Sequence, residues 1–123
     1  MNAKNLPSNP VEITLSMLNT KWKPLIIKEL LTGTKRFGEI KGSVGAITQK
    51  VLTANLRDME EKGLVKRDVY KEMPPRVEYT LTDLGYSLAM VLDSMAEWGS
   101  AYKELLKLIE KQERKAAKSS RKS

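Results

Sequence analysis

Residues 47 to 63 constrain the fold most, because they predict one short helix with both ends marked. Thr48 can cap the first free backbone N–H groups, and Gly63 supplies the left-handed residue that commonly ends a helix. Ile47 and Leu52 occupy the two positions of a hydrophobic staple, which fixes the direction in which a chain approaches its helix. We therefore predict a helix over residues 48 to 62.

The two faces of this predicted helix differ in chemistry. The inner face carries the apolar residues Ile47, Val51, Leu52, Leu56 and Met59. The outer face carries few large apolar groups and offers hydroxyl, amide and cationic donors near its start, which suits a DNA major groove. The outer residues are Thr48, Gln49, Lys50, Thr53, Ala54, Arg57 and Asp58.

Five of the outer residues are predicted to bind DNA. Gln49 can form two hydrogen bonds with adenine, and Lys50 can donate to guanine. Thr53 can contact a thymine methyl group or a phosphate, and Arg57, further along the helix, suits a phosphate. Thr48 can reach a phosphate at the helix N-terminus.

The segments before residue 47 predict a helix-turn-helix. Residues 20 to 32 are apolar nearly all round, which indicates a buried central helix. A further helix is predicted over about residues 35 to 41, with Thr34 as its cap. A turn with two glycines at residues 42 to 46 then leads into helix 48 to 62, and the second helix of such a pair is the one that reads DNA.

After Gly63 the pattern becomes alternating and predicts two strands, residues 64 to 70 and 77 to 82. A hairpin beside a helix-turn-helix is a wing, and its tip is stiffened by two prolines. Cations of the tip and arm can meet phosphate or the minor groove, although exposed cations are also ordinary surface. They are Lys71 and Arg76 at the tip, which we include among the predicted DNA-binding residues, and Lys66 and Arg67 on the arm.

Residues 83 to 111 predict a long helix with Thr82 as its cap. Its apolar residues form a heptad seam, and about 43 Å of helix is more than so small a domain can cover. We therefore expect a homodimer along this helix and the first helix, residues 11 to 19; the alternative is a seam that packs within its own chain. The predicted interface residues are Ile13, Met17, Leu88, Val91, Met95, Trp98, Tyr102, Leu105 and Ile109.

The residue types exclude most catalytic chemistry. The chain has no cysteine and no histidine, so it lacks thiol nucleophiles, disulfides, thiolate metal sites and histidine acid-base catalysis. The carboxylates Asp58, Glu60 and Glu61 are expected to be a solvated helix face, and the glycines at 42 and 45 lack the lysine and spacing of a phosphate-binding loop. We predict no enzyme, no metal site and no cofactor.

The net charge of +7 is unevenly distributed. Residues 107 to 123 carry a net charge of +5, so the rest of the chain is nearly balanced. We expect a polar leader at residues 1 to 10, a folded domain at 11 to 111, and a basic, disordered tail at 112 to 123. No run is apolar enough to span a membrane and no signal peptide is visible, so we expect a cytoplasmic protein without a membrane partner.

Six segments together resemble the HxlR family of MarR-like winged-helix regulators. The resemblance covers about residues 9 to 105 and implies a bacterial or archaeal homodimeric transcription factor. It further implies a pseudo-palindromic operator with one recognition helix per half-site and the wings outside. Arg36, in the second segment, joins the predicted DNA-binding residues. The segments are 21–23, Arg36-Phe37-Gly38-Glu39-Ile40, 47–52, 56–60, 69–70 together with 74–82, which begins Pro74-Pro75-Arg76, and Glu97-Trp98-Gly99.

One position departs from the family pattern. In the family that this chain resembles, many members have a Cys-Pro at the start of the first helix. This chain has Asn9-Pro10 there. A thiol switch is therefore excluded, which leaves a small-molecule effector or no trigger at all. The aromatic and methionine side chains could line an effector pocket, but at helical spacing they more often form core. They are Trp22, Met95, Trp98 and Tyr102.

The fold class predicted from the sequence is mostly α with a small two-stranded β-wing, a winged helix-turn-helix domain with a long C-terminal dimerisation helix. The predicted function is sequence-specific regulation of transcription on double-stranded DNA. Two alternatives stay open. A winged helix can serve as a protein-protein module, although this outer face lacks the aromatic anchor of a typical interface. A nucleoid-type binder without sequence preference would instead depend on the basic tail and the wing.

Overall fold

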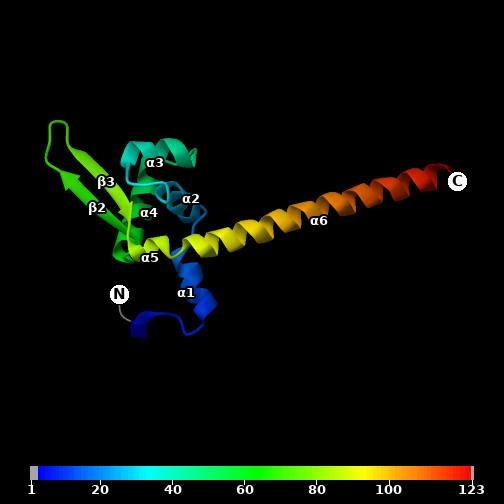
Figure 1. Ribbon diagram of the computed structural model, residues 1–123, viewed down its shortest axis with the longest axis horizontal. Coiled ribbons are helices and arrows are strands. Elements are labelled where there is room, and N and C mark those ends of the chain that lie inside the picture. The colour runs from blue at the N-terminus through cyan, green and yellow to red at the C-terminus, as the bar shows by residue number, and fades with distance from the viewer. Residues whose placement is uncertain (1–2, 123) are drawn as a thin grey trace. The chain divides into compact units, whose positions relative to one another are not determined.

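The structure is a computed structural model that describes residues 3 to 122, and these form two compact units divided after Ala89. Figure 1 labels the helices α1 to α6 and the strands β2 and β3. The elements of the first unit are a 3-10 helix (Ala3–Asn5), α1 (Pro10–Met17), α2 (Trp22–Leu30), β1 (Lys35–Arg36), α3 (Phe37–Val44), α4 (Gln49–Glu61), β2 (Val65–Tyr70), β3 (Arg76–Leu81) and α5 (Asp83–Tyr86). The second unit is α6 (Ala89–Lys122) from Met90 onward.

Helix α2 lies at the centre of the first unit, as predicted. Its Ile26, Ile27 and Leu30 are fully buried, and it contacts α3, α4 and β3. Helix α4 contributes Leu52 and Leu56 to the same core. The core therefore fixes the inner face of α4 and leaves its other face to solvent.

Both predicted ends of α4 are confirmed. The Thr48 hydroxyl oxygen accepts a hydrogen bond from the backbone N–H of Val51 at 3.1 Å. Gly63 has a φ of +77°, a conformation that glycine adopts without steric cost. The predicted inner face is wrong at one position, because Val51 is 37% exposed and Asn55 is buried instead.

The predicted helix over residues 35 to 41 is displaced in the structure. Residues 35 and 36 form β1, paired with β3, and α3 runs from Phe37 to Val44. Thr34 does not cap a helix, because its hydroxyl forms a 2.8 Å hydrogen bond with the Thr80 hydroxyl. The N-cap residue is Arg36, whose backbone N–H donates to the Glu39 carboxylate at 2.9 Å.

The wing hairpin, β2 and β3 in Figure 1, is confirmed, but it belongs to a three-stranded antiparallel sheet in the order β1-β3-β2. The register pairs Val65 with Leu81 at the base and Tyr70 with Arg76 at the tip. Arg76 is therefore a strand residue, and the connecting tip is residues 71 to 75. The prediction of two strands missed β1, because a two-residue strand is defined by its partner and carries no periodicity of its own.

The predicted continuous helix from residue 83 is interrupted. Thr82 caps α5 as predicted, with its hydroxyl oxygen accepting from the Gly85 N–H at 3.1 Å. Helix α5 ends at Tyr86, and α6 begins at Ala89. Leu88, a predicted interface residue, lies at this break and is only 9% exposed, so it belongs to the core of the first unit.

Helix α6 continues beyond its predicted end at Lys111. Residues 112 to 122, expected to be a disordered tail, are helical in the structure. At 34 residues, α6 is about 51 Å long. No helix in residues 3 to 122 is long and apolar enough to cross a lipid bilayer.

Candidate nucleic-acid interface

Helix α4 presents a polar outward surface, which we call the reading face. Thr48, Gln49, Lys50 and Arg57 are exposed on it, and Thr53 is half-buried. Four of these side chains, all except Thr48, line one shallow surface together with Ala54. The structure thus brings together all five residues predicted from this helix.

The hydrogen bonds of the reading face are confined to α4 itself. The Thr53 hydroxyl donates to the backbone carbonyl of Gln49 at 2.8 Å, which leaves its methyl group as the free contact surface. Throughout the described part of the chain, the side chains of Gln49, Lys50 and Arg57 have no hydrogen-bonding or ionic partner. Their donors are therefore available to a ligand.

One carboxylate joins α4 to two other segments. Asp58 accepts hydrogen bonds from the ammonium groups of Lys23, on α2, and of Lys62. Lys62 also donates to the backbone carbonyl of Ser16, in α1, at 2.6 Å. The expectation that Asp58 is a solvated surface carboxylate is therefore wrong.

Lys23 is the most unusual member of this cluster, because its residue is only 3% exposed. A buried ammonium group requires partners, and it finds them in Asp58 and in the Asn19 amide oxygen at 2.6 Å. Burial raises the pKa of Asp58, but hydrogen bonds from Lys23 and Lys62 outweigh this effect and hold the pKa below its ordinary value.

Asn55 makes a second connection, between α4 and the turn that precedes α2. Its amide oxygen accepts from the Thr20 hydroxyl at 2.7 Å, and its amide nitrogen donates to the Val51 carbonyl at 2.8 Å. The Thr20 hydroxyl in turn accepts from the Lys23 backbone N–H at 3.2 Å. These polar bonds fix the rotation of α4 about its axis, so the direction of the reading face depends on them.

We predict that Asp58→Asn lowers the free energy of unfolding by about 2 kcal/mol at pH 7, less than for a fully buried pair because the Asp58 side chain is 35% exposed. The pKa of Asp58 is lower in the folded state than in the unfolded state, where it is about 3.9. Asp58 therefore stabilises the fold above the unfolded-state pKa, and this stabilisation is lost as the pH falls through the folded-state pKa. Urea unfolding between pH 7 and pH 3 should show the wild type and the variant converging in acid.

Glu61→Gln is the control, because Glu61 is an exposed carboxylate on the same helix with no ion pair in residues 3 to 122. It should change stability by less than about 0.5 kcal/mol at either pH. An Asp58→Asn loss that stays constant with pH would contradict a role for the charge.

The wing residues differ in their availability. Lys71 is exposed at the tip. Arg76, predicted to contact DNA, lies over the Tyr70 ring at 4.1 Å and forms an ion pair with Glu72 at 3.2 Å. Arg36, also predicted, is exposed in β1 opposite Glu78. Lys71 and Arg36 are thus freer to meet a phosphate than Arg76 is.

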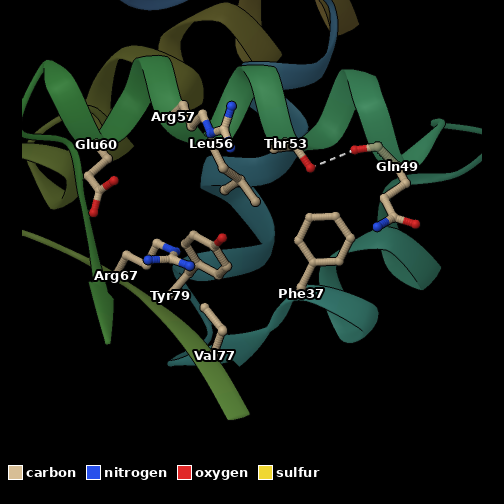
Figure 2. Close-up of a pocket in the computed structure, with 9 residues that line it drawn as sticks. All are labelled: Phe37, Gln49, Thr53, Leu56, Arg57, Glu60, Arg67, Val77 and Tyr79. Carbon is tan, nitrogen blue, oxygen red and sulfur yellow. Dashed lines mark hydrogen bonds between the residues drawn. The ribbon is translucent and has the colours of Figure 1, made fainter. Parts of the chain in front are cut away.

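A hollow of about 350 Å³ lies between α4, the start of α3 and the hairpin (Figure 2). It was not predicted, because its walls come from segments up to 42 positions apart. Arg67, named in the sequence only as a cation of the wing arm, lines it opposite α4. The lining residues are Phe37, Gln49, Thr53, Leu56, Arg57, Glu60, Arg67, Val77 and Tyr79.

The predicted dimer seam on α6 consists largely of exposed apolar side chains. Trp98 is 70% exposed and stacks on Tyr102 with ring centroids 5.5 Å apart. Met95, Leu105 and Ile109 are also exposed, and Val91 is half-buried. So large a row of exposed apolar groups on one helix is typical of an interaction surface.

The remaining predicted residues lie in the first unit. Ile13 and Met17 of α1 are half-buried, whereas Val11 and Leu15 of the same helix are exposed and were not predicted. Trp22, considered for an effector pocket, is half-buried with the Lys21 ammonium 4.6 Å from its ring centre.

A buried central helix, then the pair α3 and α4 joined by a turn, with a free polar face on the capped α4, and then an antiparallel hairpin define a winged helix-turn-helix DNA-binding protein. The chain belongs to the HxlR-like helix-turn-helix family, whose model matches residues 17 to 107. It is a transcriptional regulator of this type and not an enzyme; regulators of the family bind DNA.

Relatives and solved structures agree with this assignment. The HTH-type transcriptional regulator YdeP of Bacillus subtilis is 43% identical over 101 residues, covering 82% of this chain and 79% of the relative. A MarR-family regulator from Enterococcus faecalis V583 is 45% identical, with a TM-score of 0.71 over 85% of this chain and 96% of that one. The redox regulator HypR in its reduced form is 40% identical, with a TM-score of 0.75 over 80% and 98%.

Proposed function

We propose that the protein acts in the cytoplasm as a homodimer that binds a pseudo-palindromic operator. Each α4 would enter the major groove of one half-site, with the wing on the backbone or in the minor groove. The observation that carries this proposal is the reading face, whose base-reading donors bond to no other element and stand on a helix with a fixed rotation. A helix held in one rotation and carrying unoccupied donors is suited to the direct readout of bases.

The proposed dimer would determine the operator geometry. The exposed seam of α6, with Trp98 and Tyr102 at its centre, offers an apolar surface that a second copy would cover. In a two-fold dimer the two reading helices should lie about 34 Å apart, or a multiple of it, which sets the half-site spacing.

Each residue of the reading face has a distinct proposed role. Gln49 reads adenine and Lys50 reads guanine, while the methyl group of Thr53 contacts thymine. Arg57 binds phosphate, as does Thr48 at the helix N-terminus. On the wing, Lys71 supplies the phosphate contact more readily than Arg76, which is already held by Glu72.

We predict that Gln49→Ala with Lys50→Ala weakens specific operator binding by about a hundredfold, because each lost bidentate base contact is worth about 1 to 3 kcal/mol. Binding to unrelated DNA should fall only severalfold, since that term comes from phosphate contacts. Fluorescence anisotropy on an operator selected from random DNA and on a scrambled duplex measures both. Lys28→Ala, which removes one cation outside the reading face, is the control. An equal loss of affinity for both duplexes would contradict a base-reading role for Gln49 and Lys50.

One structural observation supports the alternative of a nucleoid-type DNA binder. Lys107, Lys111, Arg114, Lys115 and Lys118 line a single surface of α6, so the basic segment is an ordered cationic face. Footprinting on genomic fragments separates the candidates: a discrete two-fold site supports the operator model, and continuous protection supports binding without sequence preference. An absence of protection supports a protein-protein module.

A further inference from the structure

The last part of α6 carries a row of cations on one side. Five exposed side chains line a single surface there, which we call the cationic face of α6. The match to the family model ends at residue 107, so four of the five lie beyond it and the family assignment gives them no role. The members of the cationic face are Lys107, Lys111, Arg114, Lys115 and Lys118.

The cationic face lies opposite the apolar seam of the same helix. At about 3.6 residues per turn, two residues nine positions apart point to opposite sides. Four seam residues have a cation nine positions further along the chain, so a second copy that covers the seam would leave the cationic face in solvent. The four pairs are Trp98 and Lys107, Tyr102 and Lys111, Leu105 and Arg114, and Ile109 and Lys118.

The protein neutralises little of this positive charge. Lys107 forms an ion pair with Glu104 at 3.4 Å, but both groups are exposed, so the pair is weak. The Nε of Arg114 donates only to the backbone carbonyl of Glu110, at 3.4 Å. The other three members form no ion pair with any residue between 3 and 122. A positive potential therefore extends along about 17 Å of the helix.

The side chains beside the cations indicate which polyanion fits. From Glu110 to Lys122 the largest apolar side chains are those of Ala116 and Ala117. A helix that binds a membrane surface needs a large apolar face, and a protein partner is usually held by aromatic anchors. Single-stranded nucleic acid is held by aromatic stacking. The phosphates of duplex DNA require only cations, and regulators of this family bind DNA.

We propose that the cationic face of α6 binds the phosphate backbone of duplex DNA without regard to sequence, as a second contact surface separate from the reading face. It adds to operator binding and does not replace it, unlike the nucleoid-type alternative. The phosphates belong either to DNA that flanks the operator or to a second duplex. Only contact with flanking DNA rests on the proposed function, because any duplex carries the same phosphates.

The test variant replaces Lys111, Lys115 and Lys118 with glutamine, a similarly good helix former. Its matched control replaces the same three residues with arginine, which keeps the charge. The operator duplex carries flanks of about 20 base pairs, longer than α6. In fluorescence anisotropy at about 0.1 M salt, the glutamine variant should bind this duplex at least tenfold more weakly, and its salt slope should fall by about 0.9 per lost phosphate contact. The arginine variant should match the wild type.

Two further measurements identify the source of the phosphates. If the cationic face contacts flanking DNA, the loss should disappear on a duplex trimmed to the two half-sites. If it contacts a second duplex, wild-type protein bound to immobilised operator should capture a labelled unrelated duplex, and the glutamine variant should not. A loss on long unrelated DNA, in a chain without preference for any operator, would refute the proposed function and leave the cationic face standing.

Equal affinities and salt slopes for the wild type and the glutamine variant on every duplex would overturn the inference. An equal loss in the arginine variant would also overturn it, because the charge would not be the cause. If circular dichroism shows that the triple variant loses helix, Lys115→Gln alone replaces it, with a slope change of about 0.9. Binding to vesicles of phosphatidylserine and phosphatidylcholine that needs the three lysines, with DNA binding unchanged, would assign the face to lipid instead.

Discussion

Replacing Trp98 with Asp is expected to convert the protein from a dimer to a monomer and to weaken operator binding at least about a hundredfold. Trp98 is the most exposed member of the α6 seam, so in the proposed dimer it contributes the largest newly buried apolar surface. A carboxylate at that position would be buried without a partner, at a cost of several kcal/mol, and each 1.4 kcal/mol changes the dissociation constant tenfold. A monomer also loses the second half-site.

Sedimentation velocity at micromolar concentration measures the first effect, because a 13.9 kDa chain and its dimer are well separated. The matched control is Ser100→Asp, two residues further along and on the opposite side of α6, where the side chain is exposed. It introduces the same charge and should leave both the dimer and operator binding intact. A wild-type chain that sediments as a monomer would refute the dimer itself.

Replacing Gly85 with Ala should lower the free energy of unfolding by about 3 kcal/mol. A Cβ atom at this position would lie 2.2 Å from the Leu64 carbonyl oxygen and 2.8 Å from Leu81 Cδ2. The backbone cannot easily move away, because the Thr82 N–H donates to the same Leu64 carbonyl at 3.1 Å. Helix α5 would have to move away from Leu64 and Leu81, and urea unfolding at pH 7 measures the cost.

Gly42→Ala is the control for that substitution. Gly42 lies inside α3, and an added Cβ there would meet no atom within 4 Å. Alanine favours the helix over glycine by up to about 1 kcal/mol, so this variant should be neutral or more stable. If both variants lose the same stability, the close approach at Gly85 is not the cause.

The sequence predicted elements whose signals are local. Helix α4 begins and ends where Thr48 and Gly63 indicated, because a cap and a left-handed glycine act within a few residues. The hairpin was also predicted by local signals, because the alternating residue pattern indicates the two strands and the two prolines mark the tip between them. The reading face followed from α4, since the face opposite an apolar stripe is exposed wherever the stripe is buried.

The features that were missed depend on partners far away in the chain. The Lys23–Asp58 pair joins residues 35 positions apart, and β1 exists only through Tyr79 and Glu78 of β3. The break before α6 arises where Gly85 docks against Leu64, which no helical propensity reveals. The hollow has the same origin, because Phe37, Arg57 and Val77 meet only in the folded chain.

The separation between the reading face and the bonds that hold α4 has a consequence for how such regulators diversify. Asn55 and Asp58 hold the helix from its inner side, whereas the side chains of Gln49 and Lys50 bond to nothing else in residues 3 to 122. Substitutions at the outward positions should therefore cost little stability. Under the proposed function, duplicated copies of a gene with this architecture would acquire new operators by a few changes on one helix, while the rest of the domain stays under unchanged selection for folding.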